Sequence, residues 1–397
     1  MAISQLYPTQ RPALDLNFAR QKRLDSRVTF TRGSTATYVD SDGLIKTAAS
    51  GEARFDHDSD TGESLGLLIE GSRTNKLLYS SALDSGKWTS IYGISNADVF
   101  ASVAGAPDGS SAAKEVRSTA TSGTAYHSYY GNGGVGTGNW NFSIFVKPNG
   151  ITTIELKVDA AYALGGTIFD LTGDGSVTSG SGSFVKLSNG WWRLSTYGDI
   201  SAHQRADCAV YFTSAGDGSS GFYLWGAQLE AGSFPTSYIP TTTATVTRSA
   251  DVASMTGTNF SSWYNNNEGS LFFTQKTSTS PTNSTYYYLI TTGGTTNGYR
   301  IAGQVIPINA SGGNAWSSNA SWLSLYPGST FQNMAFAYSD GSAATAKDGA
   351  ILETNTESLA AVTPTTLRIA YNVTSTVSRI TYYPTRLSND QLQALTL

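Results

Sequence analysis

The chain has 397 residues, enough for two or three domains, and its composition excludes a helical bundle. Charged residues make up only 14%, aromatic residues reach 12% and there are 41 glycines, a balance typical of β-rich proteins. The net charge of −4 offers no basic field to nucleic acid or to an anionic membrane, and the aromatic content excludes a disordered chain.

Cysteine content and hydropathy narrow the class of protein further. Cys208 is the only cysteine, so an intrachain disulfide and a thiolate metal cluster are both excluded. Residues 1–18 lack an early basic cluster and an apolar core, so we expect synthesis in a cytoplasm without a signal peptide. Because no run approaches the ~18 apolar residues of a membrane span, we predict no membrane insertion.

The first segment, residues 1–80, carries mixed charges near its start. Arg23 and Arg27 belong to a charged stretch that can set the register on a partner surface. Further along, Glu70 and Arg73 can form an ion pair with each other or fix this segment to a neighbouring module. We therefore predict that residues 1–80 form an attachment segment.

An acidic cluster lies inside this segment. Its carboxylates alternate in the spacing that can wrap a calcium ion with hard oxygen ligands, at Asp56, Asp58, Asp60 and Glu63. Gly62 falls one place late for an EF-hand loop, and Leu67 stands where the bidentate glutamate belongs. The cluster therefore allows a calcium loop or a solvated hairpin, and we favour the hairpin with no metal.

Residues 81–240 alternate between apolar and polar side chains in short runs separated by Asp-Gly and Asn-Gly turns. Residues 140–146 and 154–158 each place apolar side chains on one face and polar ones on the other, which predicts half-buried strands. The pattern continues through residues 184–187, 191–197, 209–213 and 222–229 at sandwich-like spacing. We predict an antiparallel β-sandwich and assign Trp191, Trp192 and Trp225 to its core.

The Thr-, Pro- and Ser-rich residues 235–249 are typical of an extended linker, and residues 241–397 contain a second set of strands. Seven short strands are predicted, at residues 270–275, 286–291, 298–306, 332–338, 350–353, 366–371 and 378–383. Ser388 and Gln391 form a capping box at the start of a short C-terminal helix, with Leu387 placed to contact Leu392. The fold class is therefore all-β: an attachment segment and two antiparallel sandwiches with little helix.

Three segments resemble bacteriophage virion proteins of the tail-fibre and head-fibre type. Residues 14–80, from LDLNFARQKRLDSRVTF to SRTNKLLYS, resemble the leader of these fibres as one long pattern. Residues 221–251 resemble the end of a jelly roll similar to carbohydrate-binding modules, and residues 379–395 resemble the closing strand and helix of a concanavalin/laminin-G-like sandwich. The resemblance implies a virion location, other virion proteins as partners and a homotrimeric fibre subunit.

Two segments combine aromatic and asparagine side chains as sugar-binding loops do, with rings for the apolar sugar face and amides for the hydroxyls. The candidate glycan-binding residues are Tyr126, His127, Tyr129 and Tyr130 in the first segment, and Asn314, Trp316, Asn319 and Trp322 in the second. The alternative is that these aromatic side chains fill a core or a subunit interface. A host surface polysaccharide is the ligand that this hypothesis predicts.

No catalytic motif stands out in the sequence. A glycosidase needs two facing carboxyls, and Glu155, Asp159 and Glu230 occur without a recognisable motif. The three histidines are scattered, and no nucleophile elbow or phosphate loop is present. We predict a non-enzymatic virion structural protein that binds no cofactor. Two alternatives remain open: a head-fibre or decoration protein without specific glycan binding, and a polysaccharide-degrading spike.

Overall fold

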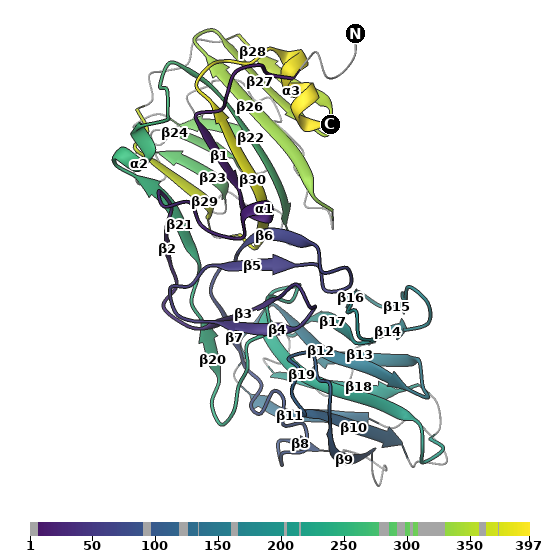
Figure 1. Cartoon of the computed structure of the whole chain (residues 1–397). Helices are drawn as coiled ribbons and strands as arrows, with labels where there is room; N and C mark the ends of the chain where they lie inside the picture. The colour runs from purple at the N-terminus through teal and green to yellow at the C-terminus, as the bar shows by residue number, and fades with distance from the viewer. Residues whose placement is uncertain are drawn as a thin grey trace.

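The chain folds into two antiparallel β-sandwiches separated by a polar junction, as Figure 1 shows. The computed structural model describes residues 7–89, 97–118, 126–133, 135–159, 166–201, 205–213, 216–277, 286–291, 298–301, 305–308, 330–356, 363–371 and 373–397. Strands dominate and helices are few, so the predicted all-β class is confirmed.

The middle sandwich consists of two six-stranded sheets. One sheet has the order β16 (Gly182–Lys186), β17 (Trp192–Asp199), β12 (Asn139–Asn149), β19 (Gly221–Ala231), β10 (Ala113–Ser118) and β9 (Ala97–Val103). The other has the order β15 (Ser176–Ser179), β14 (Thr167–Asp170), β13 (Thr153–Asp159), β18 (Arg205–Phe212), β11 (Tyr126–Gly133) and β8 (Trp88–Thr89).

The two sheets of this sandwich enclose an apolar core, as alternating strands require. Ile154, Leu156 and Val158 of β13 point into the core while the residues between them stay partly exposed, as predicted. Strand β12 differs from the prediction, because its polar face is buried as well: Asn141 and Ser143 have exposed fractions of 1% and 0%. A second apolar cluster, with Phe145 and the predicted core residues Trp191 and Trp225, covers that outer face.

The C-terminal sandwich also has two sheets. The larger one has the order β28 (Ala350–Asn355), β27 (Ser342–Lys347), β26 (Gln332–Ser339), β22 (Glu268–Thr277), β30 (Ser375–Tyr383), β6 (Ser64–Ile69) and β5 (Arg54–His57), with β1 (Leu14–Asn17) also paired to β30. The smaller one has the order β2 (Thr29–Thr31), β21 (Val252–Thr256), β29 (Thr366–Tyr371), β23 (Tyr286–Thr291), β24 (Gly298–Ile301) and β25 (Val305–Ile308).

The N-terminal segment is part of this second sandwich, which differs from the separate attachment segment that we expected for residues 1–80. Strand β1 pairs Leu14 with Tyr382 and Asn17 with Arg379, and β6 continues along the same strand, pairing Ile69 with Ser375. Strand β2 adds to the opposite sheet through β21. Strands far apart in sequence thus complete both sheets.

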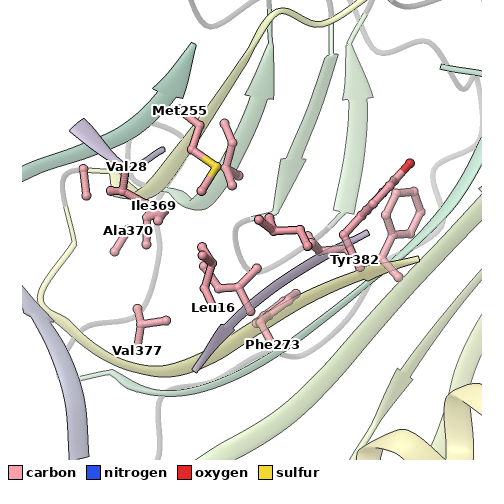
Figure 2. Packing of buried hydrophobic residues seen from close by; sticks show 14 of the residues in the cluster. Leu16, Val28, Met255, Phe273, Ile369, Ala370, Val377 and Tyr382 are labelled. Carbon is pink, nitrogen blue, oxygen red and sulfur yellow. The ribbon is translucent and has the colours of Figure 1, made fainter. Parts of the chain in front are cut away.

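The core of the second sandwich shows the same integration. Figure 2 shows Leu16 from the N-terminal segment lying beside Phe273 and Tyr382, and Val28 lying near Met255 and Ile369. Leu16 has an exposed fraction of 1%. Burial of these apolar side chains stabilises the C-terminal sandwich, so the N-terminal segment contributes directly to its folding.

Two short two-stranded sheets lie between the sandwiches (Figure 1). Strands β3 (Ala36–Val39) and β4 (Ile45–Ala48) form a hairpin, and β7 (Arg73–Asn75) pairs with β20 (Val246–Arg248). Strand β20 belongs to the predicted linker, and Tyr238 and Ile239 earlier in that stretch are buried. Residues 235–249 therefore form a packed part of the junction and not a free linker.

Helices α1 (Phe18–Gln21) and α2 (Thr258–Ser261) are single turns, and α3 (Asn389–Thr396) ends the chain. The predicted capping box is confirmed: the Ser388 hydroxyl accepts a hydrogen bond from the Gln391 amide at 3.2 Å, and the Ser388 amide donates to the Gln391 side chain at 2.9 Å. Leu387 and Leu392 lie in one apolar cluster. Within the described ranges, every helix is too short or too polar to cross a membrane.

Candidate functional site at the junction

A buried ion-pair network joins the N-terminal segment to the connection between the sandwiches. Glu70, directly after β6, accepts a hydrogen bond from Arg54 of β5 at 2.8 Å and forms a second ion pair with Arg248 of β20. Its two oxygens also accept hydrogen bonds from the Ser237 amide and hydroxyl, at 2.8 and 2.6 Å. Glu70 is buried, and both of its oxygens are engaged.

Asp251, just before β21, extends the network. Its carboxylate pairs with Arg32 at 3.0 Å and with Arg54, and it accepts a hydrogen bond from the Glu70 amide at 2.9 Å. The Asp251 amide donates in return to the Glu70 carbonyl at 2.9 Å. Three guanidinium groups thus surround two carboxylates, and all five side chains are buried.

The pKa of Glu70 shows how strongly its carboxylate interacts with the neighbouring guanidinium groups. Burial raises it, but the guanidiniums of Arg248 and Arg54 and the hydrogen bonds from Ser237 outweigh burial and lower the pKa to about 2. Removing one member of a buried ion pair typically costs about 3–5 kcal/mol, because the remaining charge is left unpaired. The network therefore holds the junction in one geometry.

A second polar cluster continues from the network towards the middle sandwich. Glu230 at the end of β19 accepts hydrogen bonds from Gln228 at 2.6 Å and from the Thr236 amide and hydroxyl at 2.8 and 2.6 Å. The N-terminal segment contacts the same sandwich elsewhere, since the Ser188 amide donates to the Ser59 carbonyl at 2.8 Å. These contacts connect the two sandwiches through the junction.

A cavity of about 260 Å³ lies at this junction, between the hairpin β3–β4, strands β5 and β6, the middle sandwich and the start of β30. Its wall combines apolar side chains, hydroxyl groups and charges. The lining residues used below are Val39, Asp56, His57, Asp58, Leu65, Leu68, Glu70, Phe145, Arg193, Pro235, Thr236, Ser237, Lys276, Thr374 and Thr376.

Arg193 of β17 contributes a guanidinium to the cavity wall from the middle sandwich. It donates one hydrogen bond, from Nη2 to the Ser143 hydroxyl at 3.1 Å, and its guanidinium lies 5.2 Å from the centre of the Phe145 ring. Its buried Nε has no hydrogen-bond partner among the described residues. Burial lowers the pKa of Arg193 more than the nearby carboxylates of Glu230 and Glu70 raise it.

Asp56 and His57 line the cavity from β5. The Asp56 carboxylate accepts a hydrogen bond from the Val39 amide at 2.7 Å, and burial raises its pKa to about 6. The His57 Nδ1 lies 3.1 Å from the Val39 carbonyl oxygen, so this nitrogen carries the proton. The other ring nitrogen, Nε2, is buried without a partner in the described part of the chain.

The structure separates the residues that we predicted for attachment. Glu70 forms its ion pairs with Arg54 and Arg248, whereas Arg73 lies over the Phe234 ring at 5.5 Å. The expected Glu70–Arg73 pair is therefore not formed, because Arg248, which pairs with Arg73 in the β7–β20 ladder, is the arginine that binds the Glu70 carboxylate. The alternative, that Glu70 fixes the segment to its neighbours, agrees with the geometry. Arg27 pairs locally with Asp25 at 2.9 Å.

Arg23 is exposed on the surface and lies outside the cavity.

The acidic cluster has a local structural role. Asp58 Oδ1 accepts hydrogen bonds from the Asp60 and Thr61 amides at 3.0 and 2.9 Å and so closes a turn. Asp56 accepts a hydrogen bond from the Val39 amide of β3. Among the described residues, no three potential metal-binding side chains gather at one point. The predicted hairpin is confirmed by the pairing of β5 with β6, and the absence of a bound metal stays a prediction.

The first predicted glycan-binding segment is a strand and not the loop that we expected. Tyr126, His127, Tyr129 and Tyr130 belong to β11, which pairs with β18 over Tyr126–Tyr211 and with β8 over Tyr129–Trp88. The β-forming tendency of clustered tyrosines accounts for the difference. The candidates of the second segment, Asn314, Trp316, Asn319 and Trp322, lie outside the described residues.

Sequence reasoning did not find Arg54, Arg193, Arg248 or Asp251. For two of these residues, Arg54 and Arg193, the sequence contains a pattern that indicates burial. Arg54 stands between Ala53 and Phe55, and Arg193 between Trp192 and Leu194, so each arginine interrupts an apolar strand. An arginine in such a position is buried only with partners, which points to a polar junction or a ligand.

Comparison with known proteins gives no family. No family model matches the chain, and no curated protein matches it.

Several solved structures share β-sandwich architecture with parts of the chain. Domain 4 of AbnA, an extracellular GH43 arabinanase from Geobacillus stearothermophilus solved with arabinotriose, is 13% identical over 37% of this chain and 73% of its own, with a TM-score of 0.29. Trypanosoma rangeli sialidase in complex with 2,3-difluoro-KDN is 10% identical over 71% of this chain and 60% of its own, with a TM-score of 0.28.

Domains LG4-5 of the mouse laminin alpha1 chain are 12% identical over 62% of this chain and 81% of their own, with a TM-score of 0.20. TM-scores this low carry no argument about function. The assignment of two β-sandwiches rests on the strand pairing of the chain itself.

Proposed function

We propose that this protein is a non-enzymatic structural subunit of a bacteriophage virion, in a fibre or spike. The resemblance of residues 14–80 to fibre leaders supports this role. The observation that carries it is the buried ion-pair network around Glu70, which ties the leader to the connection between the sandwiches. A fibre subunit has to keep its modules in a fixed relation under load, and buried directional charge pairs favour one geometry.

The proposed partners are other virion proteins and further copies of this chain in a homotrimer. Large apolar side chains remain exposed on the edge strands β16 and β28, at Val185 with an exposed fraction of 54% and Leu352 with 45%. Permanent interfaces bury such side chains. Light scattering of the protein extracted from virions is expected to give three times the 42.0 kDa of one chain; a monomer contradicts the trimer.

Attachment through the leader is tested with a charge reversal that leaves the fold intact. Arg23 is exposed, so Arg23→Glu is expected to reduce the amount of protein in purified virions, measured by quantitative mass spectrometry of its peptides. Lys87→Glu, at an exposed position before β8, is the matched control and is expected to incorporate normally. Equal incorporation of both variants contradicts attachment at Arg23, and absence of the wild-type chain from virions contradicts the virion role.

The two alternatives have their own tests. Immunogold labelling of intact virions distinguishes a tail fibre from a head fibre or decoration protein. Incubation with host surface polysaccharide distinguishes a binding role from a polysaccharide-degrading spike. Both Glu70 oxygens are held by arginine and serine side chains, and Asp58 Oδ1 is held by the Asp60 and Thr61 amides, so both carboxylates near Asp56 already have structural partners. We therefore expect no new reducing ends; their appearance contradicts the non-enzymatic role.

A further inference from the structure

The junction cavity contains polar groups that are built into the wall without partners. His57 is more than nine-tenths buried, with an exposed fraction of 7%, and its Nε2 accepts nothing from the described residues. Because Nδ1 donates to the Val39 carbonyl, Nε2 is the ring nitrogen left for a hydrogen bond with a hydroxyl group. A buried polar atom without a partner favours a ligand or water that can bond to it.

Arg193 brings a cation to the wall from the middle sandwich, and no described residue forms an ion pair with it. The two carboxylates that act on Arg193 are already engaged, Glu230 with Gln228 and Thr236, and Glu70 with its arginines and Ser237. Arg193 is partly buried, and a guanidinium binds a carboxylate with two parallel hydrogen bonds. Arg193 is therefore suited to a carboxylate that enters the cavity.

The wall formed by β5 has the opposite character. Asp56 and Asp58 place carboxyl groups there, and Lys276 on the same side lies close enough to Asp58 to lower its pKa together with the turn amides, although burial raises it. A simple inorganic anion would meet repulsion from these carboxyls. A molecule with a carboxylate at one end and hydroxyl groups at the other satisfies both walls, because hydroxyls donate to carboxylates.

The remaining lining fits a saturated ring. Leu65, Leu68, Phe145 and Pro235 supply apolar surface, and hydroxyl groups come from Thr236, Ser237, Thr374 and Thr376. The volume of about 260 Å³ lies just below the range of roughly 300–1,000 Å³ for drug-sized ligands, so one sugar unit fits better than an oligosaccharide.

We propose that the junction cavity binds one hexuronic acid unit, with its carboxylate on Arg193 and its hydroxyl groups on His57 and Asp56. The proposal rests on the proposed fibre or spike role and deepens the predicted binding of a host surface polysaccharide, since acidic sugars occur in such polysaccharides. It moves the binding site from the aromatic segments to the junction. Two sources supply this chemistry: a uronic acid at the end or on a branch of a polysaccharide, and the free monosaccharide.

The test uses the purified full-length chain with D-glucuronate, D-glucose and sulfate as separate probes in titration calorimetry. We expect one glucuronate per chain, with D-glucose at least about tenfold weaker because it lacks the carboxylate. A polysaccharide that contains glucuronic acid, compared with free glucuronate, shows which source the site accepts. Equal binding of sulfate and glucuronate overturns the proposal in favour of an adventitious anion, and no binding of glucuronate overturns it in favour of a hydrated cavity.

Three variants locate the site. Arg193→Gln and His57→Phe are expected to weaken glucuronate binding at least about tenfold, and Lys186→Gln on β16 is the control that leaves it unchanged. Melting curves show whether each variant folds. If Arg193→Gln or His57→Phe fails to fold, the binding measured for the other of these two variants decides the test. Loss of binding in Trp316→Ala with normal binding in Arg193→Gln overturns the junction site. Because binding is measured on the isolated chain, a failure here is distinct from a failure to incorporate into virions.

Discussion

The two sandwiches obtain their strands from very different stretches of chain. The middle sandwich takes all of its strands, β8 to β19, from residues 88–231, whereas the C-terminal sandwich takes β1, β2, β5 and β6 from residues 14–69 and the rest from residues 252–383. The first is closed by local connections and the second by pairing across almost the whole chain. The difference teaches that the N-terminal residues 14–69 supply strands to one sandwich and only outer contacts, such as that of Ile45, to the other.

The junction differs from both sandwiches in the forces that hold it. The cores of the sandwiches are apolar, and burial stabilises them with little dependence on pH. The junction is held by Glu70, Asp251 and three arginines, so its stability depends on charge and geometry. Four predictions separate these contributions.

Deleting residues 1–69 is expected to have the largest effect. The C-terminal sandwich loses four strands and Leu16 from its core and is expected to unfold, while the middle sandwich stays folded. A separate attachment segment, as predicted for residues 1–80, would instead leave both sandwiches folded when it is removed. Hydrogen exchange measured by mass spectrometry resolves the two regions. Retained protection in β22 and β30 contradicts the prediction.

Glu70→Gln tests the junction by removing one charge. Arg248 is then buried without a carboxylate and Arg54 keeps only Asp251, and we expect the free energy of unfolding to fall by about 3–5 kcal/mol. Urea denaturation gives the change. The matched control is Glu63→Gln at an exposed position, expected to change stability by less than about 0.5 kcal/mol. Equal effects of the two substitutions show that the network does not stabilise the fold.

Leu16→Ala compares the two cores with a single substitution in each. Truncation of this buried side chain on β1 is expected to cost about 2–5 kcal/mol and to raise hydrogen exchange in the C-terminal sandwich only. Ile144→Ala on β12 is the counterpart and is expected to affect the middle sandwich only. Destabilisation of both sandwiches by either substitution indicates that they unfold as one unit.

The pH dependence of stability is the smallest expected effect. Because the folded pKa of Asp56, about 6, lies above its ordinary value of 3.8, stability falls as the pH rises from about 4 to 6. Asp56→Asn keeps the acceptor for the Val39 amide and is expected to add about 3 kcal/mol at pH 7.5 and to remove this fall. Denaturation at several pH values measures it, and an unchanged slope contradicts the raised pKa.

The stability that Glu70 contributes depends on pH in the opposite direction. Its folded pKa of about 2 lies below its ordinary value of 4.5, so the stability it contributes is present above pH 4.5 and is lost as the pH falls towards 2. The same denaturation series with Glu70→Gln therefore lacks this acid limb. The two substitutions together assign each side of the pH profile to one carboxyl.

Local sequence patterns predicted much of the fold. The alternation in residues 154–158 predicted a half-buried strand, and the Ser388–Gln391 capping box predicted the last helix, because both features depend on neighbours in sequence. Trp191, Trp192 and Trp225 are buried as predicted, since large apolar side chains inside strand patterns have few alternatives to burial, but only Trp192 lies in the core between the two sheets.

The candidate site was less readable, because its residues come from distant segments. Glu70 was singled out, but its partners Arg54 and Arg248 lie 16 and 178 positions away along the chain. Asn141 and Ser143 were predicted to face solvent, yet the outer face of β12 is covered by another part of the molecule.

Composition, turn signals and alternation by themselves determined that this is an all-β protein with two sandwiches, because each strand records locally which of its faces is apolar. Only the tertiary structure decided which strands pair, that β1 and β6 complete the C-terminal sandwich, and that Arg193 and His57 line one cavity. The physical reason is that pairing and charge contacts depend on distances in space, which side-chain periodicity along the chain does not encode.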